Sequence, residues 1–151
     1  MDVINRKISR DLKHLGIKQE SDLFYVKKDN ISRLCSKTPK GNYLIIKGLK
    51  MTKIIRKHED IVVSSAFTLS EINNFLKYYN QYFKVYFDFE SNSWKINKTI
   101  FKIFFLNHKK RKYIKEFNDM IKRNFNSEVN TKSEILSFLI KTEFININDI
   151  N

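Results

Sequence analysis

Residues 23–47 read LFYVKKDNISRLCSKTPKGNYLIIK, a pattern that indicates extended structure. Three short runs rich in β-branched and aromatic residues are separated by two polar segments, Lys28-Asp29-Asn30 and Pro39-Lys40-Gly41-Asn42. Asp, Asn, Pro and Gly are the residues that tight turns prefer, and short apolar runs between them are typical of strands. We therefore expect two or three antiparallel strands in this part of the chain.

The segment before these strands has the pattern of an amphipathic helix that ends at Gly16. Its apolar residues recur at helical spacing, at Ile4, Ile8, Leu12 and Leu15. The other faces carry basic or titratable side chains, namely Arg6, Lys7, Arg10, Lys13 and His14. This basic side either lies on phosphates or is a solvated charged face, and both interpretations stay open.

Beyond the first strands the pattern changes twice. Residues 49–58 are ambiguous between a short helix and a linker, whereas Ile61-Val62-Val63 predicts a short apolar strand. Thr68, followed three residues later by Glu71, predicts a capping box at the start of the next helix. One face of that helix must be buried, because its apolar positions recur at three and four residues: Ile72, Phe75, Leu76, Tyr79 and Phe83.

A hairpin with one solvated face is expected next. Residues 84–90 alternate between apolar and polar, Ser91-Asn92-Ser93 supplies a turn, and Trp94-Lys95-Ile96 starts the return strand. Residues 100–106 are expected to continue the sheet as a third strand. A helix follows the basic run after them, with Tyr113, Ile114, Phe117, Met120 and Ile121 as its apolar positions.

The C-terminal part differs from the rest in charge. Residues 1–123 hold 27 basic and 12 acidic residues, while the remainder holds 2 basic and 4 acidic ones. Thr131 and Glu134 predict a second capping box, for a helix whose apolar positions are Ile135, Phe138 and Leu139. An apolar tail suited to packing on the body or on a partner follows, with Phe144, Ile145, Ile147 and Ile150.

These segments together predict an α+β fold. We expect an antiparallel sheet with helices packed on one face, and a C-terminal helix and tail docked on the body. A chain of 151 residues has the usual size of one domain. Residues 1–126 are expected to form a basic α+β nucleic-acid-binding body, and residues 127–151 a C-terminal helix and apolar tail that belong to the same domain or dock on a partner.

The charge balance is the strongest global signal. Lys and Arg number 29 against 16 Asp and Glu, which gives a net charge of +13 at pH 7. Such self-repulsion indicates an anionic partner, and nucleic acid fits best because each lysine on a phosphate releases counterions. Part of the excess can also come from AT-rich codons, since Lys, Asn, Ile, Phe and Tyr are all abundant and Ala66 is the only alanine.

Two basic clusters are the candidate binding sites. The first lies at a predicted strand-to-helix junction, where free backbone N–H groups and the helix dipole would add to the side-chain charge. The second lies between two apolar strands. Lysine predominates over arginine, which favours phosphate contacts over the reading of base edges and predicts weak sequence specificity. The candidate residues are Lys50, Lys53, Arg56, Lys57, His108, Lys109, Lys110, Arg111, Lys112, Lys115, Lys122 and Arg123.

Catalytic chemistry has one candidate constellation. Asp88 and Glu90 alternate along one strand with Lys95 on the facing arm, a trio that either holds Mg²⁺ in a nuclease or forms the polar outer face of a hairpin. His14, His58 and His108 are far apart and lie among lysines, so neither a zinc site nor a catalytic triad is visible. A glycine-rich phosphate loop is also absent from the sequence, and we expect no cofactor.

Two further features concern single residues. Tyr78 and Tyr86 are expected by periodicity to be exposed, where they would offer stacking platforms for unpaired bases. Cys35 is the only cysteine and is expected to be a small buried residue. A lone cysteine fits a reducing compartment, either the cytoplasm or an organelle that encodes the protein. The sequence shows neither a signal peptide nor a transmembrane run, so no membrane association is expected.

Taken together, the sequence predicts a non-catalytic RNA-binding protein, a component or bound factor of a ribonucleoprotein particle such as a ribosome. Its partners would be the RNA phosphate backbone and, through the C-terminal helix and tail, neighbouring proteins of the particle. Two alternatives remain open: a Mg²⁺-dependent nuclease that uses Asp88 and Glu90, and a protein-interaction factor that binds an acidic partner.

Overall fold

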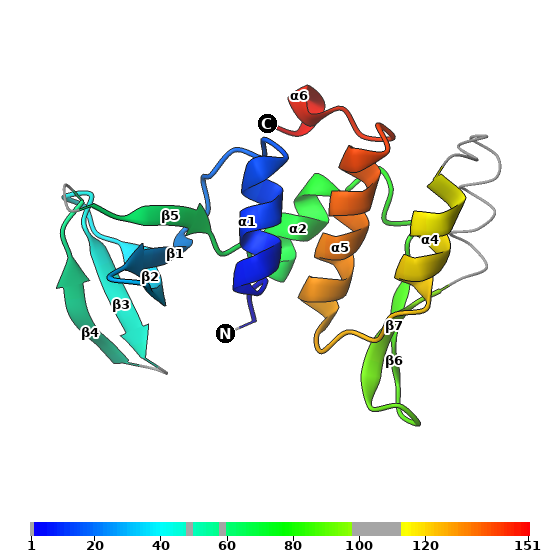
Figure 1. Ribbon diagram of the computed structural model, residues 1–151, viewed down its shortest axis with the longest axis horizontal. Coiled ribbons are helices and arrows are strands. Elements are labelled where there is room, and N and C mark those ends of the chain that lie inside the picture. The colour runs from blue at the N-terminus through cyan, green and yellow to red at the C-terminus, as the bar shows by residue number, and fades with distance from the viewer. Residues whose placement is uncertain (1, 48–49, 58–59, 98–112) are drawn as a thin grey trace. The chain divides into compact units, whose positions relative to one another are not determined.

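The computed structural model describes residues 2–47, 50–57, 60–97 and 113–151, and it confirms a mixed α+β fold (Figure 1). The chain packs as two compact units, each of which is described by itself. The sheet unit comprises Asn5–Phe67, and the helical unit comprises Met1–Ile4 with Thr68–Asn151.

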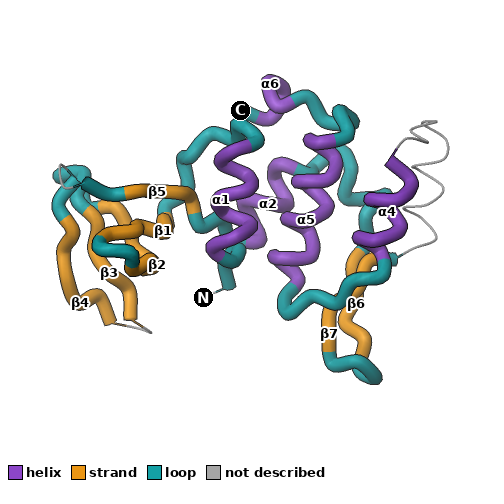
Figure 2. Tube along the Cα trace, in the orientation of Figure 1, coloured by secondary structure: helices purple, strands orange, loops and turns teal. Residues whose placement is uncertain are grey.

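The sheet unit combines one helix with a five-stranded sheet in which all neighbouring strands are antiparallel (Figure 2). The strand order β4-β3-β2-β1-β5 is a meander of four strands, to which β5 adds by pairing with β1. The elements are α1 (Arg6–His14), β1 (Leu23–Lys28), β2 (Ile31–Lys37), β3 (Tyr43–Lys47), β4 (Lys50–Ile55) and β5 (Val62–Ser65).

The turn between β1 and β2 forms where the sequence predicts it. Lys28 pairs with Ile31, so only Asp29 and Asn30 make the loop, and both have positive φ, 53° and 63°. A two-residue hairpin loop of this kind matches the twist of its strands, and Asn and Asp tolerate its left-handed backbone better than other residues with side chains. The turn residues therefore fix the register of the whole β1–β2 pair.

That register separates the two faces of the sheet. Phe24 and Val26 are buried with Cys35, Ile45 and Ile55 in the core of the sheet unit. Because successive side chains of a strand alternate between faces, the residues that intervene in β1 lie on the opposite face. The same alternation that builds the core thus presents Tyr25 and Lys27 on the other side of the sheet.

The expectation that residues 49–58 form a short helix or a linker is wrong for the described part of this segment. Lys50–Ile55 is strand β4, paired with β3 so that Ile55 lies opposite Tyr43. Ile55 is buried and Ile54 is exposed, which is the two-residue period of a strand. The long-range partner strand β3 decided between conformations that local spacing left ambiguous.

The helical unit contains four helices and one hairpin among its described residues. Its long helix α5 packs against α2 and against both strands of the hairpin, which confirms that the C-terminal helix docks on the body. The elements are α2 (Leu69–Phe75), β6 (Val85–Asp88), β7 (Ser93–Ile96), α4 (Ile114–Ile121), α5 (Glu128–Lys141) and α6 (Ile147–Ile150).

One predicted capping box is confirmed and the other is wrong. The Thr68 hydroxyl accepts from the Glu71 N–H at 3.3 Å, and the Glu71 carboxylate accepts from the Thr68 N–H at 3.1 Å. Helix α5, however, begins a turn before Thr131, at Glu128, with Ser127 as its N-cap. The extended backbone of Ser127 lets its side chain accept from the N–H three residues later, a role that Thr131 inside the helix does not have.

Helix α2 is shorter than the spacing of its apolar residues suggests. It ends at Phe75, and the following residues form turns whose hydrogen bonds run from Tyr79 N to Leu76 O and from Tyr82 N to Tyr79 O. Leu76 and Phe83 are nevertheless fully buried. Burial of apolar side chains at helical spacing therefore continues past the end of the helix, through tighter turns.

The expected hairpin forms, but its first strand ends at Asp88, two residues early, and its turn spans residues 89–92 instead of 91–93. The Asp88 carboxylate accepts from the Glu90 N–H and the Ser91 hydroxyl, and these hydrogen bonds turn the chain at that point. Strands β6 and β7 pair from Val85↔Ile96 to Asp88↔Ser93, and the proposed third strand at 100–106 lies outside the described residues. In the tail, Ile145 is buried and its N–H donates to Leu139 O at 3.1 Å. No helix in the described part of the chain is long and apolar enough to cross a membrane.

Candidate nucleic-acid interface

The predicted basic cluster at the strand-to-helix junction lies mostly outside the described residues. His108, Lys109, Lys110, Arg111 and Lys112 all fall there, so only the residues on and after α4 can be placed. Lys115 and Lys122 are exposed. Arg123 is exposed as well, but its guanidinium donates to the Glu134 carboxylate at 3.0 Å and lies over the ring of Phe125.

The second predicted cluster lies on and after strand β4 of the sheet unit. Lys53, Arg56 and Lys57 are exposed there, and Lys50 contributes its backbone to the strand. The Lys57 N–H donates to the Asn42 side chain at 3.1 Å, which fixes the end of this strand beside the β2–β3 loop. The two predicted clusters therefore belong to different units of the protein.

Charge is concentrated in the sheet unit. Its 63 residues hold 15 basic and 6 acidic side chains, which gives a net charge of +9. The other 88 residues hold 14 basic and 10 acidic side chains, which gives a net charge of +4. A basic surface is consequently a property of the sheet unit more than of the chain as a whole.

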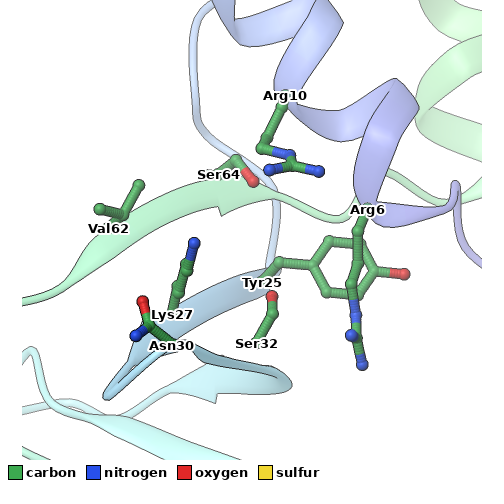
Figure 3. Close-up of a pocket in the computed structure, with 8 residues that line it drawn as sticks. All are labelled: Arg6, Arg10, Tyr25, Lys27, Asn30, Ser32, Val62 and Ser64. Carbon is green, nitrogen blue, oxygen red and sulfur yellow. The ribbon is translucent and has the colours of Figure 1, made fainter.

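A cavity of about 220 Å³ opens on the face of the sheet opposite its core (Figure 3). We call it the cationic cavity, because three of its side chains are cations and the rest are neutral. Helix α1, both strands of the β1–β2 hairpin with its loop, and strand β5 contribute to it. Its residues are Arg6, Arg10, Tyr25, Lys27, Asn30, Ser32, Val62 and Ser64.

Strand register brings the sheet residues of the cavity together. Lys27 pairs with Ser32 on one side and with Val62 on the other, and Tyr25 pairs with Ser64. Residues directly opposite each other in antiparallel strands share a face. The floor of the cavity thus consists of two adjacent rows of paired residues, Ser32, Lys27 and Val62 in one row and Tyr25 and Ser64 in the other. Figure 3 shows the Lys27 amine extending from β1 toward β5.

Helix α1 supplies the two arginines. The Ser9 hydroxyl reaches Ser64 Oγ at 2.7 Å and Ser65 O at 2.8 Å, which fixes the helix on β5. Arg6 and Arg10 stand one helical turn apart on the cavity side, with the Arg10 guanidinium beside Ser64 (Figure 3). The basic side of this helix, which the sequence left between two interpretations, therefore borders a cavity.

The charged side chains that line the cavity among the described residues are all basic. No carboxylate lines it, and no acidic side chain of the described chain forms an ion pair with Arg6, Arg10 or Lys27. Burial raises the pKa of Tyr25, and the positive charge of Arg6 opposes that rise only in part. Tyr25 is accordingly a neutral phenol at pH 7.

The size of the cavity limits what it can hold. Sites for whole small molecules usually enclose roughly 300–1,000 Å³. At about 220 Å³ this cavity suits a single group such as a phosphate better than a whole nucleotide. Cationic side chains with neutral donors around a group-sized space form an anion-binding arrangement.

Asp88 is the last residue of β6 and Glu90 lies in the turn after it, so the two carboxylates do not alternate along one strand as expected. Asp88 accepts from Lys95 Nζ at 2.9 Å, from the Ser91 hydroxyl at 2.9 Å and from the Glu90 N–H at 3.1 Å. These hydrogen bonds, above all that from Lys95, lower the pKa of Asp88. In the part of the chain that the structure describes, no three His, Cys, Asp or Glu side chains gather where a metal could bind.

The exposed tyrosines are where the sequence predicted them. Tyr78 is 73% exposed and Tyr86 is 46% exposed, so both rings are accessible. Their proposed stacking on bases stays a prediction.

Sequence reasoning missed most of the cationic cavity. The sequence pattern indicates Arg6 and Arg10 only as part of a basic helix side, and it does not single out Tyr25, Lys27 or Ser64. Lys27 follows the apolar run of residues 23–26 and stands beside Lys28, so the sequence alone does not mark it as a site residue. Its partners on β2 and β5 depend on a register that spacing along the chain does not reveal.

No family model matches this chain, and no curated protein or solved structure matches it either. The function therefore has to be argued from the geometry and charge of the molecule.

Proposed function

We propose that this protein binds RNA without catalysing a reaction, as a component or bound factor of a ribonucleoprotein particle such as a ribosome, and that the sheet unit supplies its main phosphate-binding surface. One observation carries the proposal. The unit with a net charge of +9 also holds a cavity that, among the described residues, is lined by three cations and no carboxylate. A surface of this kind attracts the most abundant polyanion of the cell.

The composition of the cations supports weak sequence specificity. Lysine accounts for 23 of the 29 basic residues, and an ammonium binds phosphate as a point charge with little dependence on the base. Lys53, Arg56 and Lys57 add exposed basic side chains to the sheet unit on and after β4. Binding should accordingly follow the number of phosphates more than the sequence of the RNA.

The partner proteins of such a particle are proposed to contact the C-terminal part. A second cavity of about 440 Å³ lies beside the tail in the helical unit, between the end of α2 and the segment 143–150. Phe75, Tyr78 and Ile150 line it together with polar residues. This mixed lining supports protein contact more than phosphate contact. A reducing compartment, compatible with the lone Cys35, completes the proposal.

A salt titration of RNA binding tests the proposal. Affinity of the full chain for a generic single-stranded RNA should fall steeply with salt concentration, measured by fluorescence anisotropy. Replacing Arg6, Arg10 and Lys27 together with Gln should reduce the slope of log K against log salt by about 2, since each lost phosphate contact removes about 0.7 from the slope for a single strand.

The matched control replaces three exposed lysines of the helical unit, Lys77, Lys84 and Lys141, with Gln. It changes the net charge by the same amount and should leave the slope within about 0.5 of the wild-type value. Absence of RNA binding, or an affinity independent of salt, contradicts the proposal. The same samples with Mg²⁺, run on a denaturing gel, test the nuclease alternative: cleavage that disappears in Asp88→Asn supports that alternative.

A further inference from the structure

We infer that the cationic cavity holds the terminal phosphomonoester of a single-stranded RNA, so that the protein recognises phosphorylated RNA ends. This inference rests on the proposed RNA binding and assigns a specific group of the RNA to a specific site. It concerns Arg6, Arg10 and Lys27 with the neutral side chains around them.

The charge of the cavity matches a monoester better than a diester. A phosphodiester carries one negative charge, whereas a terminal monoester carries about 1.5 to 2 at pH 7. Among the residues that the structure describes, three cationic side chains and no carboxylate line this space. A single diester in this space would leave two positive charges uncompensated, while a dianionic end leaves about one.

The donor groups point to the same conclusion. Asn30 and Ser32 add neutral polar side chains to the three cations, so donors come from the helix, the hairpin loop and the sheet. A monoester offers three terminal oxygens and a diester offers two. Hydrogen-bond donors on several sides of the cavity therefore suit the monoester, which has more acceptor oxygens than the diester.

Arginine use also supports a defined phosphate site. The whole chain has only six arginines among 29 basic residues, yet two of the three cations in the cavity are arginines. A guanidinium can bind two oxygens of one phosphate through a planar pair of N–H groups, which a lysine does not do. Arg6 and Arg10 start one helical turn apart on α1. The N-cap Asn5 and the hydrogen bond between Ser9 and Ser64 fix the position of this helix.

The shape of the site favours an end over the middle of a strand. Helix α1, the β1–β2 hairpin and β5 each contribute walls to a space of about 220 Å³ (Figure 3). An internal phosphate carries the chain onward on both sides, whereas a terminal one has a single attachment and enters end-on. A flexible single strand can do this at little cost, because its end is not held in a duplex.

The test compares RNA oligonucleotides of one sequence that carry a 5′-phosphate, a 3′-phosphate or hydroxyls at both ends. We expect at least one of the phosphorylated forms to bind the full-length protein roughly tenfold more tightly than the hydroxyl form, as one strong charge-assisted hydrogen bond would give. Millimolar inorganic phosphate should remove this preference by occupying the same site.

Variants assign the preference to the cavity. The double variant R10Q and K27Q should bind all three oligonucleotides with nearly equal affinity, whereas the matched pair K77Q and K84Q should keep the preference. Arg10, Lys27, Lys77 and Lys84 are all exposed, and circular dichroism of each variant verifies that it is folded.

The outcomes separate this inference from the proposed function. Equal affinity of the wild-type protein for all three oligonucleotides, with a steep salt dependence, overturns the inference and leaves RNA binding intact. No binding of any oligonucleotide overturns both. A phosphoserine peptide provides the last comparison. The assignment to RNA ends is overturned if this peptide binds more tightly than any of the RNAs and displaces the 5′-phosphorylated RNA at a lower concentration than the hydroxyl RNA needs.

Discussion

Cys35 shows how the environment of one residue sets its chemistry. It lies on the core face of β2 with no exposed surface, among Phe24, Val26 and Ile45. Burial raises the pKa of its thiol from the usual 9.0 to about 11, with only a small opposing effect from Arg33. The thiol is therefore protonated and shielded at neutral pH, which makes it a packing residue and not a nucleophile.

A thiol reagent should detect this shielding. At pH 8 the native protein should react with Ellman's reagent far more slowly than the protein in 6 M guanidinium chloride, because both burial and the raised pKa suppress the thiolate. The variant Gln81→Cys adds a thiol at an exposed position and should show one fast and one slow reaction. Equal rates for native and unfolded wild-type protein would contradict the buried position of Cys35.

The sign of the pH effect on stability follows from the same shift. Because the pKa of the thiol is higher in the folded than in the unfolded chain, its contribution to stability is complete below about pH 9. It then declines as the pH rises toward 11. Urea unfolding at several alkaline pH values would show this decline, and Cys35→Ala would remove its thiol component.

At the scale of elements, local hydrogen bonds at the ends decide where each one begins. Asp29 and Asn30 adopt the left-handed conformation that closes the β1–β2 hairpin, and Thr68 and Glu71 cap α2 reciprocally. Helix α5 begins at the extended residue Ser127, whose side chain accepts from Asn130 N at 3.1 Å. Glu134, which the sequence suggested as a capping residue, instead forms an ion pair with Arg123.

Two substitutions distinguish these roles. Ser127→Ala should lower the free energy of unfolding by about 1 kcal/mol, because an N–H at the start of α5 loses its acceptor. Glu134→Ala should change it by no more than about 0.5 kcal/mol, since it breaks only a partly exposed ion pair. Urea denaturation followed at 222 nm measures both. If Glu134→Ala lowers the free energy of unfolding more than Ser127→Ala does, Glu134 acts as a capping residue after all.

At the scale of the whole molecule, basic charge is divided between two regions. The sheet unit carries a net +9 and holds the cationic cavity, while His108–Lys112 forms a basic run in the other part of the chain. The proposed RNA binding would use one or both of these regions, and the salt dependence of the affinity distinguishes the two cases.

Three variants measure this directly. Replacing Lys109, Lys110, Arg111 and Lys112 with alanine should reduce the salt slope by up to about 3, and the cavity triple variant by about 2. If one RNA lies on both regions, the variant with all seven substitutions should reduce the salt slope by the sum of these two reductions. A combined slope no flatter than that of the cavity variant alone would show that the two regions do not bind the same RNA.

Elements whose hydrogen bonds and faces involve neighbours in the chain are predictable from the sequence. Alternation and turn residues predicted the strands in residues 23–47, helical spacing predicted α1, and the Thr68–Glu71 pair predicted the start of α2. These features are legible because their hydrogen bonds and faces repeat over two to four residues. The excess of basic residues was likewise readable directly.

Features that depend on residues far apart in the chain follow from strand pairing and packing. Lys50–Ile55 became a strand because β3 offers it a partner, and Arg10, Lys27 and Ser64 meet because β5 pairs with β1 while α1 packs on β5. The residues of the cationic cavity span positions 6 to 64 of the chain. Pairing between segments so far apart is set by register and packing, which leave no periodic trace in the sequence.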